Sequence, residues 1–363
     1  VHSEIYVDKT GLLEYTNKVM NTSQQNICVS RPRRFGKSVA ADMLAAYYDR
    51  SVDSFALFEH LEISSQKSYG IHLNQYDVIK LNMQEFLSGT KNVDEMLERI
   101  QKFLIFDLLD AYHQVRFRDE KSLIQVMKDV YSHTGHPFVI LIDEWDCLFR
   151  EYQNDKEAQK RYLDFLRAWL KDKEYVALAY MTGILPIAKY SSGSELNMFW
   201  EYTMASEAKY NEYFGFTDSE VDQLYEKYTR NTREIYISRE DLKEWYDGYT
   251  TKSGERMYNP RSVVLALPNN NIGNYWTSSG PYDEIFYYIR QNIDDVQNDL
   301  ALMISGEAVT AKIQEYAAVS MNLTTKNEIF SAMIVYGFLS YENGEVRIPN
   351  KELMNKFDDM IQG

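Results

Sequence analysis

The sequence predicts an α/β protein whose parallel sheet is covered by helices, and three observations support this class. Residues 138–142 form the most apolar run of the chain, which is typical of a strand buried on both faces of a parallel sheet. Strand-like and helix-like segments alternate up to about residue 205. A short apolar strand, a loop that contains glycine and a helix follow one another in residues 26–50, which is the order of a βα unit.

The individual elements of this first part follow from the spacing of the apolar residues. Apolar or alternating runs predict strands at residues 26–30, 77–82, 138–144 and 175–182. Amphipathic stretches predict helices at about residues 11–21, 37–50, 92–112, 120–133 and 156–172. We expect residues 1–205 to form one domain with an αβα core.

After about residue 205 the alternation gives way to helices. Thr217, followed three residues later by Glu220, is a capping box that starts a helix. Pro260 suits the first turn of another. The expected helices lie at residues 217–228, 239–247 and 260–267. We therefore expect residues 206–285 to form a small helical lid.

The last part, residues 286–363, combines helices with a hairpin. Asn343-Gly344 between two alternating runs is a strong signal for a tight β-turn. Helices followed by such a hairpin indicate a winged-helix-like module.

Charge and composition limit the classes of function. The formal net charge of the 363-residue chain is −15, which disfavours broad, sequence-independent binding to nucleic acid because that binding needs many Lys and Arg. Cys28 and Cys147 adjoin apolar runs, and we expect buried free thiols in a reducing compartment. No apolar run approaches ~18 residues, and the N-terminus has no signal peptide pattern. We expect a cytoplasmic protein that does not enter a membrane.

The loop Ser30–Ser38, SRPRRFGKS, ends like a phosphate-binding loop. In such a loop, backbone N–H groups at the start of a helix point at phosphates, and the helix dipole adds to the attraction. Lys37 is expected to contact the β- and γ-phosphates, and the Ser38 hydroxyl to bind Mg²⁺. Arg31 replaces the usual first glycine, which changes the entrance of the loop. The residues expected to bind the nucleotide here are Arg33, Arg34, Phe35, Gly36, Lys37, Ser38 and Val39.

A second motif supports this interpretation. The apolar run at 138–142 ends in Asp143-Glu144, which is the Walker B pattern. Asp143 is expected to hold a Mg²⁺-bound water, and Glu144 to orient or deprotonate the attacking water. The alternative is that two acids merely end a core strand. Thr182, at the end of the next strand, is a candidate sensor of the γ-phosphate; the alternative is a simple strand cap.

The chain at this point resembles the bacterial AAA-ATPase-like proteins, which often carry a PD-(D/E)XK nuclease-like domain after the ATPase. The matching segments run through nearly the whole chain: YVDKT (6–10), RPRRFGKS (31–38), LIDEWD (141–146), TGI (182–184), YFGFTDSEV (213–221), WYDGY (245–249), YNP (258–260) and IPNKE (348–352). In that family Arg31 is the usual residue. The chain departs from the family at Arg261, where an aromatic is common, and at Trp145, where Tyr is commoner.

The resemblance implies a P-loop ATPase core with ATP or ADP and Mg²⁺ as ligands. By analogy with signal-transduction ATPases it also implies that Pro260 contacts adenine, while the alternative is a proline that only starts a lid helix. A nuclease-like domain would follow IPNKE. We find no convincing D…(D/E)-x-K set among the 363 residues, so no nuclease activity is carried over.

Three functions follow as hypotheses. The first is slow, Mg²⁺-dependent hydrolysis of ATP that drives a conformational switch. The second is a nucleotide-gated regulatory module with negligible turnover, which acts on a nuclease-like domain or a DNA partner. The third is DNA binding by the winged-helix-like module, which the acidic charge disfavours. Efficient hydrolysis often needs an arginine finger, in some cases from a second copy of the chain. The candidates are Arg150, Arg161, Arg167, Arg230 and Arg233.

Overall fold

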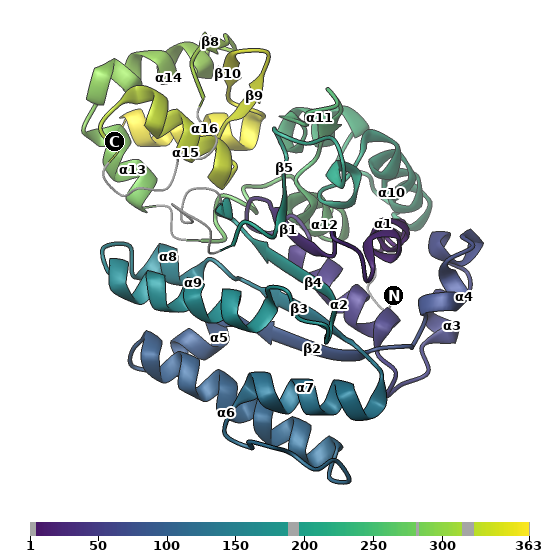
Figure 1. Cartoon of the computed structure of the whole chain (residues 1–363). Helices are drawn as coiled ribbons and strands as arrows, with labels where there is room; N and C mark the ends of the chain where they lie inside the picture. The colour runs from purple at the N-terminus through teal and green to yellow at the C-terminus, as the bar shows by residue number, and fades with distance from the viewer. Residues whose placement is uncertain (1–4, 188–195, 281–282, 314–322, 363) are drawn as a thin grey trace.

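The centre of the protein is a five-stranded parallel sheet (Figure 1). The computed structural model describes residues 5–187, 196–280, 283–313 and 323–362. The strands lie in the order β2 (Asp77–Asn82), β3 (Phe138–Asp143), β4 (Val176–Gly183), β1 (Asn26–Ser30) and β5 (Trp200–Thr203). All residues of β1, β3 and β4 are buried, as the continuous apolar runs predict. The α/β class is confirmed.

Helices cover both faces of this sheet and make three layers (Figure 1). Side chains of β1, β3 and β4 that point to one face, such as Val29, Leu141 and Tyr180, pack with α1 (Leu12–Val19) and α2 (Lys37–Tyr48). The opposite face packs on four further helices: α5 (Met83–Ser88), α6 (Val93–Ala111), α7 (Leu123–Thr134) and α9 (Lys156–Leu170). Short helices join these layers: α3 (Phe55–Phe58), η1 (Glu62–Ser65), α4 (Tyr69–His72), α8 (Cys147–Glu151) and η3 (Asn211–Tyr213).

A helical unit with its own apolar cluster follows the sheet. It contains α10 (Asp218–Asn231), α11 (Arg239–Tyr246), α12 (Pro260–Asn269) and a two-stranded antiparallel ribbon of β6 (Tyr249–Thr250) and β7 (Arg256–Met257). The capping box of Thr217 and Glu220 is present at the start of α10, and Pro260 occupies the first turn of α12. Val221, Leu242 and Val263 are fully buried between the three helices.

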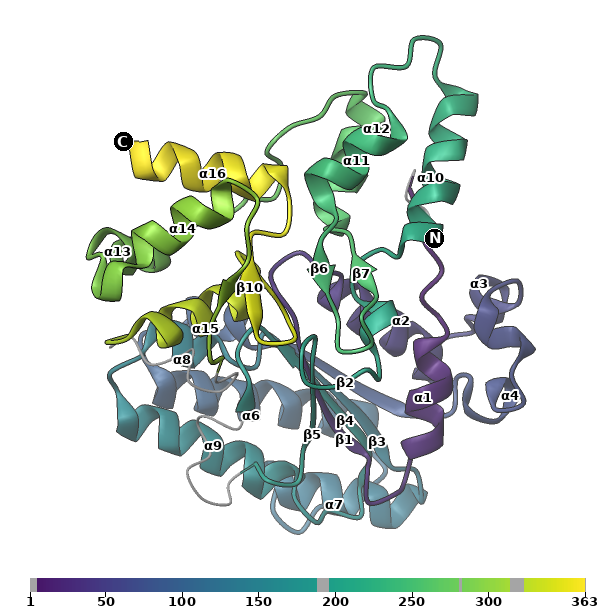
Figure 2. The ribbon, with the colours of Figure 1, turned by 90° about the horizontal axis from the view of Figure 1, so that it is seen from above.

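The C-terminal module combines helices with a three-stranded sheet and lies beside the helical unit (Figure 2). Its elements are α13 (Asp283–Arg290), η4 (Ile293–Asp295), α14 (Val296–Ile304), β8 (Val309–Thr310), α15 (Lys326–Tyr336), β9 (Ser340–Glu342), β10 (Glu345–Arg347) and α16 (Lys351–Gln362). The strand order is β8-β10-β9. Asn343 and Gly344 both have positive φ, 51° and 85°, as the tight hairpin turn requires. Within the described ranges, no helix is both long and apolar enough to cross a membrane.

Candidate nucleotide-binding site

The loop between β1 and α2 has the shape of an anion-binding loop. Gly36 precedes the helix with φ 94° and ψ 10°, a left-handed conformation that favours glycine. Arg34 also has a positive φ, 63°. The N–H groups of Arg34 and Gly36 have no acceptor among the described residues. Ser38 and Val39 are exposed in the first turn of α2, and Val39 is 70% exposed. The loop thus offers free donors at a helix N-terminus.

Lys37, the first residue of α2, is a buried cation. Its Nζ donates to the carbonyl oxygens of Arg31 at 3.0 Å and Pro32 at 2.7 Å. Burial lowers the pKa of Lys37 to about 8, and the nearby carboxylates of Glu144, Asp146 and Asp143 only partly offset this effect. An ammonium group that lacks full solvation gains from an anion placed beside it.

The carboxylate of Asp143 collects three donors from three segments. Ser38 Oγ donates to Oδ2 at 2.5 Å, Thr182 Oγ1 donates to Oδ1 at 2.7 Å, and the backbone N–H of Glu144 donates to Oδ1 at 2.9 Å. The sheet order explains this meeting, because β4 lies between β1 and β3 and brings Thr182 beside both strand ends. The two motifs that the sequence links, GKS and Asp143-Glu144, therefore form one cluster.

Glu144 follows Asp143 in a left-handed conformation, φ 55°, and its carboxylate binds the guanidinium of Arg150 on α8. Arg150 also contacts Asp146 Oδ2 with its Nε at 3.3 Å, and its side chain is only 11% exposed. Burial disfavours the charged form of this arginine, but Asp146 and Glu144 more than offset that effect and raise its pKa. Arg150 is thus held inside its own chain.

Asp146 is a buried residue of this site to which the sequence interpretation gave no role. It is 0% exposed, and its Oδ2 accepts hydrogen bonds from the backbone N–H groups of Ile184 at 3.0 Å and Leu185 at 2.8 Å. Gly183 is required beside it, because a Cβ there would lie 2.5 Å from Asp146 Oδ1. Asp146 anchors the turn after β4, which carries Thr182, and the only sequence signal for it is its place in LIDEWD.

Arg31 explains the missing first glycine of the loop. Its side chain is 1% exposed, and its nitrogens donate to the carbonyl of Tyr202 at 2.9 Å and to Asn211 Oδ1 at 3.0 Å. The guanidinium also lies 5.3 Å from the ring centroid of Phe214. Burial lowers the pKa of Arg31 to about 10. Arg31 therefore fastens β5 and the start of YFGFT to the loop, and its head is directed at protein atoms.

The remaining predicted ligands occupy different surroundings. Arg33 is partly buried and Arg34 is exposed, whereas Phe35 is fully buried and packs edge-on against Tyr249 with ring centroids 5.0 Å apart. The carbonyl of Phe35 accepts a hydrogen bond from Gly215 N–H at 3.1 Å. Phe216 of the same segment forms a β-bridge with Tyr258. The YFGFT and YNP motifs therefore run beside the phosphate-binding loop.

Pro260, the last residue of YNP, is buried in the first turn of α12. The N-cap Asn259 accepts hydrogen bonds from the N–H groups of Arg261 and Ser262 at 3.0 and 3.4 Å. The helix-starting alternative thus describes the local geometry of Pro260. Among the arginine-finger candidates, Arg161 pairs with Asp94 and Arg230 pairs with Glu226, while Arg167 and Arg233 are exposed.

One further residue of the loop environment escaped the sequence interpretation. The indole Nε1 of Trp276 donates a hydrogen bond to the carbonyl of Arg33 at 2.8 Å. Trp276 is 0% exposed and lies 243 residues away along the chain. No local pattern in the sequence marks such a contact.

A GKS loop after one buried strand, an Asp-Glu pair after another and a strand between them define a P-loop NTPase fold. A solved structure has the same fold: the Walker-type ATPase PABY2304 of Pyrococcus abyssi aligns with a TM-score of 0.50 at 12% identity, over 96% of this chain and 94% of that chain. A likeness at this identity shows the fold alone.

The family follows from the sequence comparison. The model described as "Predicted AAA-ATPase" matches residues 2–192, so the chain belongs to the AAA-ATPase-like family and is a P-loop ATPase-like protein. A curated relative, "Uncharacterized protein in vnfD 5'region" of Azotobacter chroococcum mcd 1, is 24% identical over 283 residues. The alignment covers 76% of this chain and 50% of the relative, so the chain spans about half the length of that relative.

Proposed function

We propose that the protein binds an adenine nucleotide with Mg²⁺ and hydrolyses ATP slowly, and that this turnover drives a conformational switch. The single observation that carries the proposal is the Ser38–Asp143–Thr182 cluster at the end of a loop with free N–H donors. A hydroxyl and a carboxylate oxygen suit Mg²⁺, which is usually held by one or two carboxylates together with phosphate oxygens and waters. The residues present therefore fit the Mg²⁺–nucleotide complex.

Each residue of the cluster has a separate task in this proposal. Lys37 leaves the loop carbonyls and contacts the phosphates, while the N–H groups of residues 33–39 surround them. Ser38 and Asp143 hold the metal, which neutralises phosphate charge when it is bound. Thr182 senses the γ-phosphate, and Glu144 takes a proton from the attacking water or orients it. Pro260 is assigned to the adenine side.

A second candidate function is a nucleotide-gated module with negligible turnover. The observation that favours it is the pairing of Glu144 with Arg150, because a carboxylate bound to a guanidinium must be released before it can contact the attacking water. Both candidates need the same nucleotide site. They differ only in whether Glu144 becomes available while ATP is bound.

Two variants separate the candidates. Lys37→Ala is expected to lose nucleotide binding, measured by calorimetry with Mg²⁺ and ATP, because Lys37 contacts the nucleotide throughout the reaction. Glu144→Gln is expected to keep binding while phosphate release falls about 10²–10⁴-fold. Lys156→Ala and Glu157→Gln, at exposed positions at the start of α9, serve as controls. A wild type without measurable turnover establishes the gated module, whereas equal, measurable turnover in the wild type and Glu144→Gln shows that Glu144 is not the base. A folded wild type that binds no nucleotide rejects both candidates.

A further inference from the structure

The phosphate-binding loop is held from outside by the linker that joins the helical unit to the C-terminal module. Trp276 lies in this linker, between α12 and α13, and its indole N–H donates to the carbonyl of Arg33. In an anion-binding loop the N–H groups must face the ligand, so the carbonyls point outward and need their own partners. Trp276 supplies such a partner at the centre of the loop.

A buried carboxylate of the C-terminal module fixes the backbone of Trp276. Glu352, the last residue of IPNKE, is 2% exposed and lies in the first turn of α16. Its Oε2 accepts from the N–H groups of Trp276 at 3.1 Å and Thr277 at 3.0 Å, and its Oε1 accepts from Ser262 Oγ at 2.6 Å. All of these partners belong to the helical unit or the linker, so one carboxylate joins α12, the linker and α16.

The end of α15 contacts the same loop directly. Gly337 has φ 88°, and a Cβ at this position would lie 2.8 Å from Cβ of Pro32 and 3.3 Å from the Trp276 ring. The carbonyl of Gly337 accepts a hydrogen bond from Tyr249 Oη at 2.9 Å. Only a glycine permits this close approach of the C-terminal module to the loop.

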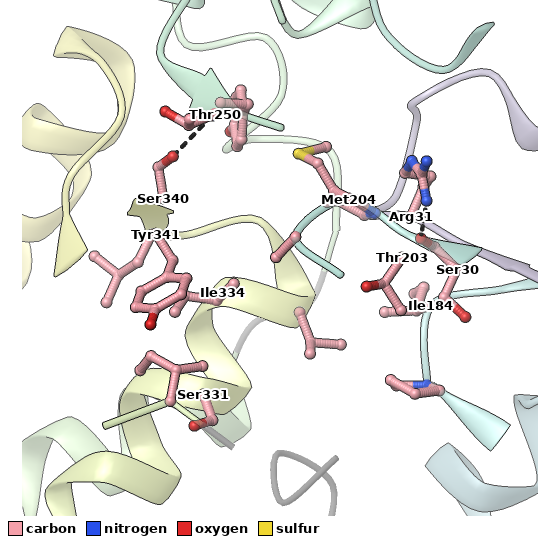
Figure 3. A pocket seen from close by; sticks show the side chains of 17 residues that line it. Ser30, Arg31, Ile184, Thr203, Met204, Thr250, Ser331, Ile334, Ser340 and Tyr341 are labelled. Atoms are coloured by element: carbon pink, nitrogen blue, oxygen red, sulfur yellow. Dashed lines mark hydrogen bonds between the residues drawn. The ribbon is translucent and has the colours of Figure 1, made fainter. Parts of the chain in front are cut away.

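A small cavity beside these contacts shows how the module is seated (Figure 3). Ser331, Ile334 and Val335 of α15 line one side of it, and the end of β1, with Ser30 and Arg31, lines the other. The cavity measures about 50 Å³. Above it, the backbone N–H of Thr250 donates to Ser340 Oγ at 2.9 Å, which ties β6 to β9. The module is therefore hydrogen-bonded to β6 beside the loop and lies close to Pro32 of the loop itself.

We propose that Trp276 and Glu352 are positioning residues of the phosphate-binding loop, and that through them nucleotide binding is coupled to docking of the C-terminal module. The proposal rests on the proposed function for its ligand, an adenine nucleotide. It gives the IPNKE motif a role, because Glu352 links α16 to the loop through Trp276. A nucleotide that stabilises the outward position of the Arg33 carbonyl stabilises the docked module by the same amount.

Hydrogen exchange of the nucleotide-free 363-residue chain tests the structural half of the proposal. Trp276→Phe retains an aromatic ring but loses the donor to Arg33. We expect the amides of Ala40 and Gly215, which donate to the loop carbonyls of Gly36 and Phe35, to exchange about threefold to tenfold faster, the effect of one lost hydrogen bond. Glu352→Ala removes the acceptors of Trp276 and Thr277 and should do the same, whereas Glu352→Gln retains them and should restore slow exchange. Trp200→Phe, at a 47% exposed position of β5, is the matched control.

Calorimetry and tryptophan emission test the coupling. Trp276→Phe and Glu352→Ala should weaken the affinity for ATP and Mg²⁺ about threefold to tenfold relative to Trp200→Phe, measured at a temperature at which all three variants are folded. The emission change on ATP binding should be lost in Trp276→Phe and kept in Trp200→Phe. Loop exchange and affinity equal to those of Trp200→Phe in both variants would overturn the proposal. If the two variants exchange faster at the loop but the wild type binds no nucleotide, the positioning role is upheld and the proposed function is rejected.

Discussion

The guanidinium of Arg150 binds the carboxylate of Glu144 within one chain, and its Nε lies 3.3 Å from Asp146. An arginine finger that acts between subunits reaches into the site of a neighbouring copy. Arg150 is engaged by two carboxylates of its own chain and is largely buried, so in this conformation it serves its own site. The pair also fixes the position of the Glu144 carboxylate before any nucleotide binds.

Mixing two inactive variants distinguishes these roles of Arg150. Arg150→Ala is expected to impair the protein that carries it, because fully buried Asp146 and partly exposed Glu144 lose their cation. Breaking a buried ion pair in this way typically lowers the free energy of unfolding by about 3–5 kcal/mol. When it is mixed with Lys37→Ala, which retains Arg150, phosphate release should not return. Recovery of activity in the mixture would show that Arg150 acts across a subunit interface.

Ser38 is expected to determine the metal dependence of binding. Ser38→Ala should bind ATP in EDTA as the wild type does, because the loop N–H groups and Lys37 are unchanged. It should lose the gain in affinity that Mg²⁺ gives the wild type, because Oγ is the hydroxyl at Asp143. Calorimetry with and without Mg²⁺ checks this, with Ser38→Thr as the control that keeps a hydroxyl. An undiminished Mg²⁺ effect in Ser38→Ala removes Ser38 from the metal site.

Arg33 and Arg34 are expected to act through charge. Reversal of both to Glu should weaken ATP binding about tenfold or more, because charge-assisted contacts with phosphate are replaced by repulsion. Raising the salt concentration should shrink the difference. The double variant Arg116→Glu and Arg167→Glu changes the net charge equally at exposed positions of the ATPase part. Equal affinities of the two double variants would leave Arg33 and Arg34 as surface residues without a role in binding.

Gly248 is expected to be indispensable for joining the helical unit to the C-terminal module. Its φ is +100°, and a Cβ would lie 1.9 Å from the carbonyl oxygen of Pro349. Gly248→Ala must displace backbone, which costs about 1–3 kcal/mol and lowers the melting temperature by about 2–10 °C. Gly254→Ala is the matched control, because Gly254 has φ +83° with nothing within 4 Å of its Cβ. Equal melting temperatures of Gly248→Ala and Gly254→Ala would show that the backbone around Gly248 and Pro349 shifts without loss of stability.

The strands of the core could be predicted because burial on both faces leaves a continuous apolar signature. β1, β2, β3 and β4 lie within one residue of their expected bounds. β5, residues 200–203, was not predicted, because it has only four residues and just one of them is buried. Its place in the sheet comes from pairing with β1 and from the hydrogen bond between Arg31 and Tyr202, neither of which leaves a local pattern.

The candidate site likewise has a part that could be predicted from the sequence and a part that could not. Parallel strands end at one edge, so the meeting of Ser38, Asp143 and Thr182 follows from the strand assignments alone. The roles of Asp146, Trp276 and Glu352 could not be derived, because each depends on a contact between segments that are distant in the chain. The hydrogen bonds of Asp146 form only when the turn after β4 packs on the residues after β3. Those of Trp276 and Glu352 form only when the loop, the linker and α16 are packed together.

The seating of α15 has a consequence for any ligand of the C-terminal module. Ser331, Ile334 and Val335 are spaced as one face of a helix, and that face is turned toward the end of β1. A ligand that needs this face competes with the ATPase core for it. Such competition is reciprocal: the factor by which the nucleotide strengthens docking of the module is the factor by which it weakens the apparent affinity for the ligand. Occupancy of the phosphate-binding loop would then appear as a shift in the midpoint of a titration with the ligand of the C-terminal module.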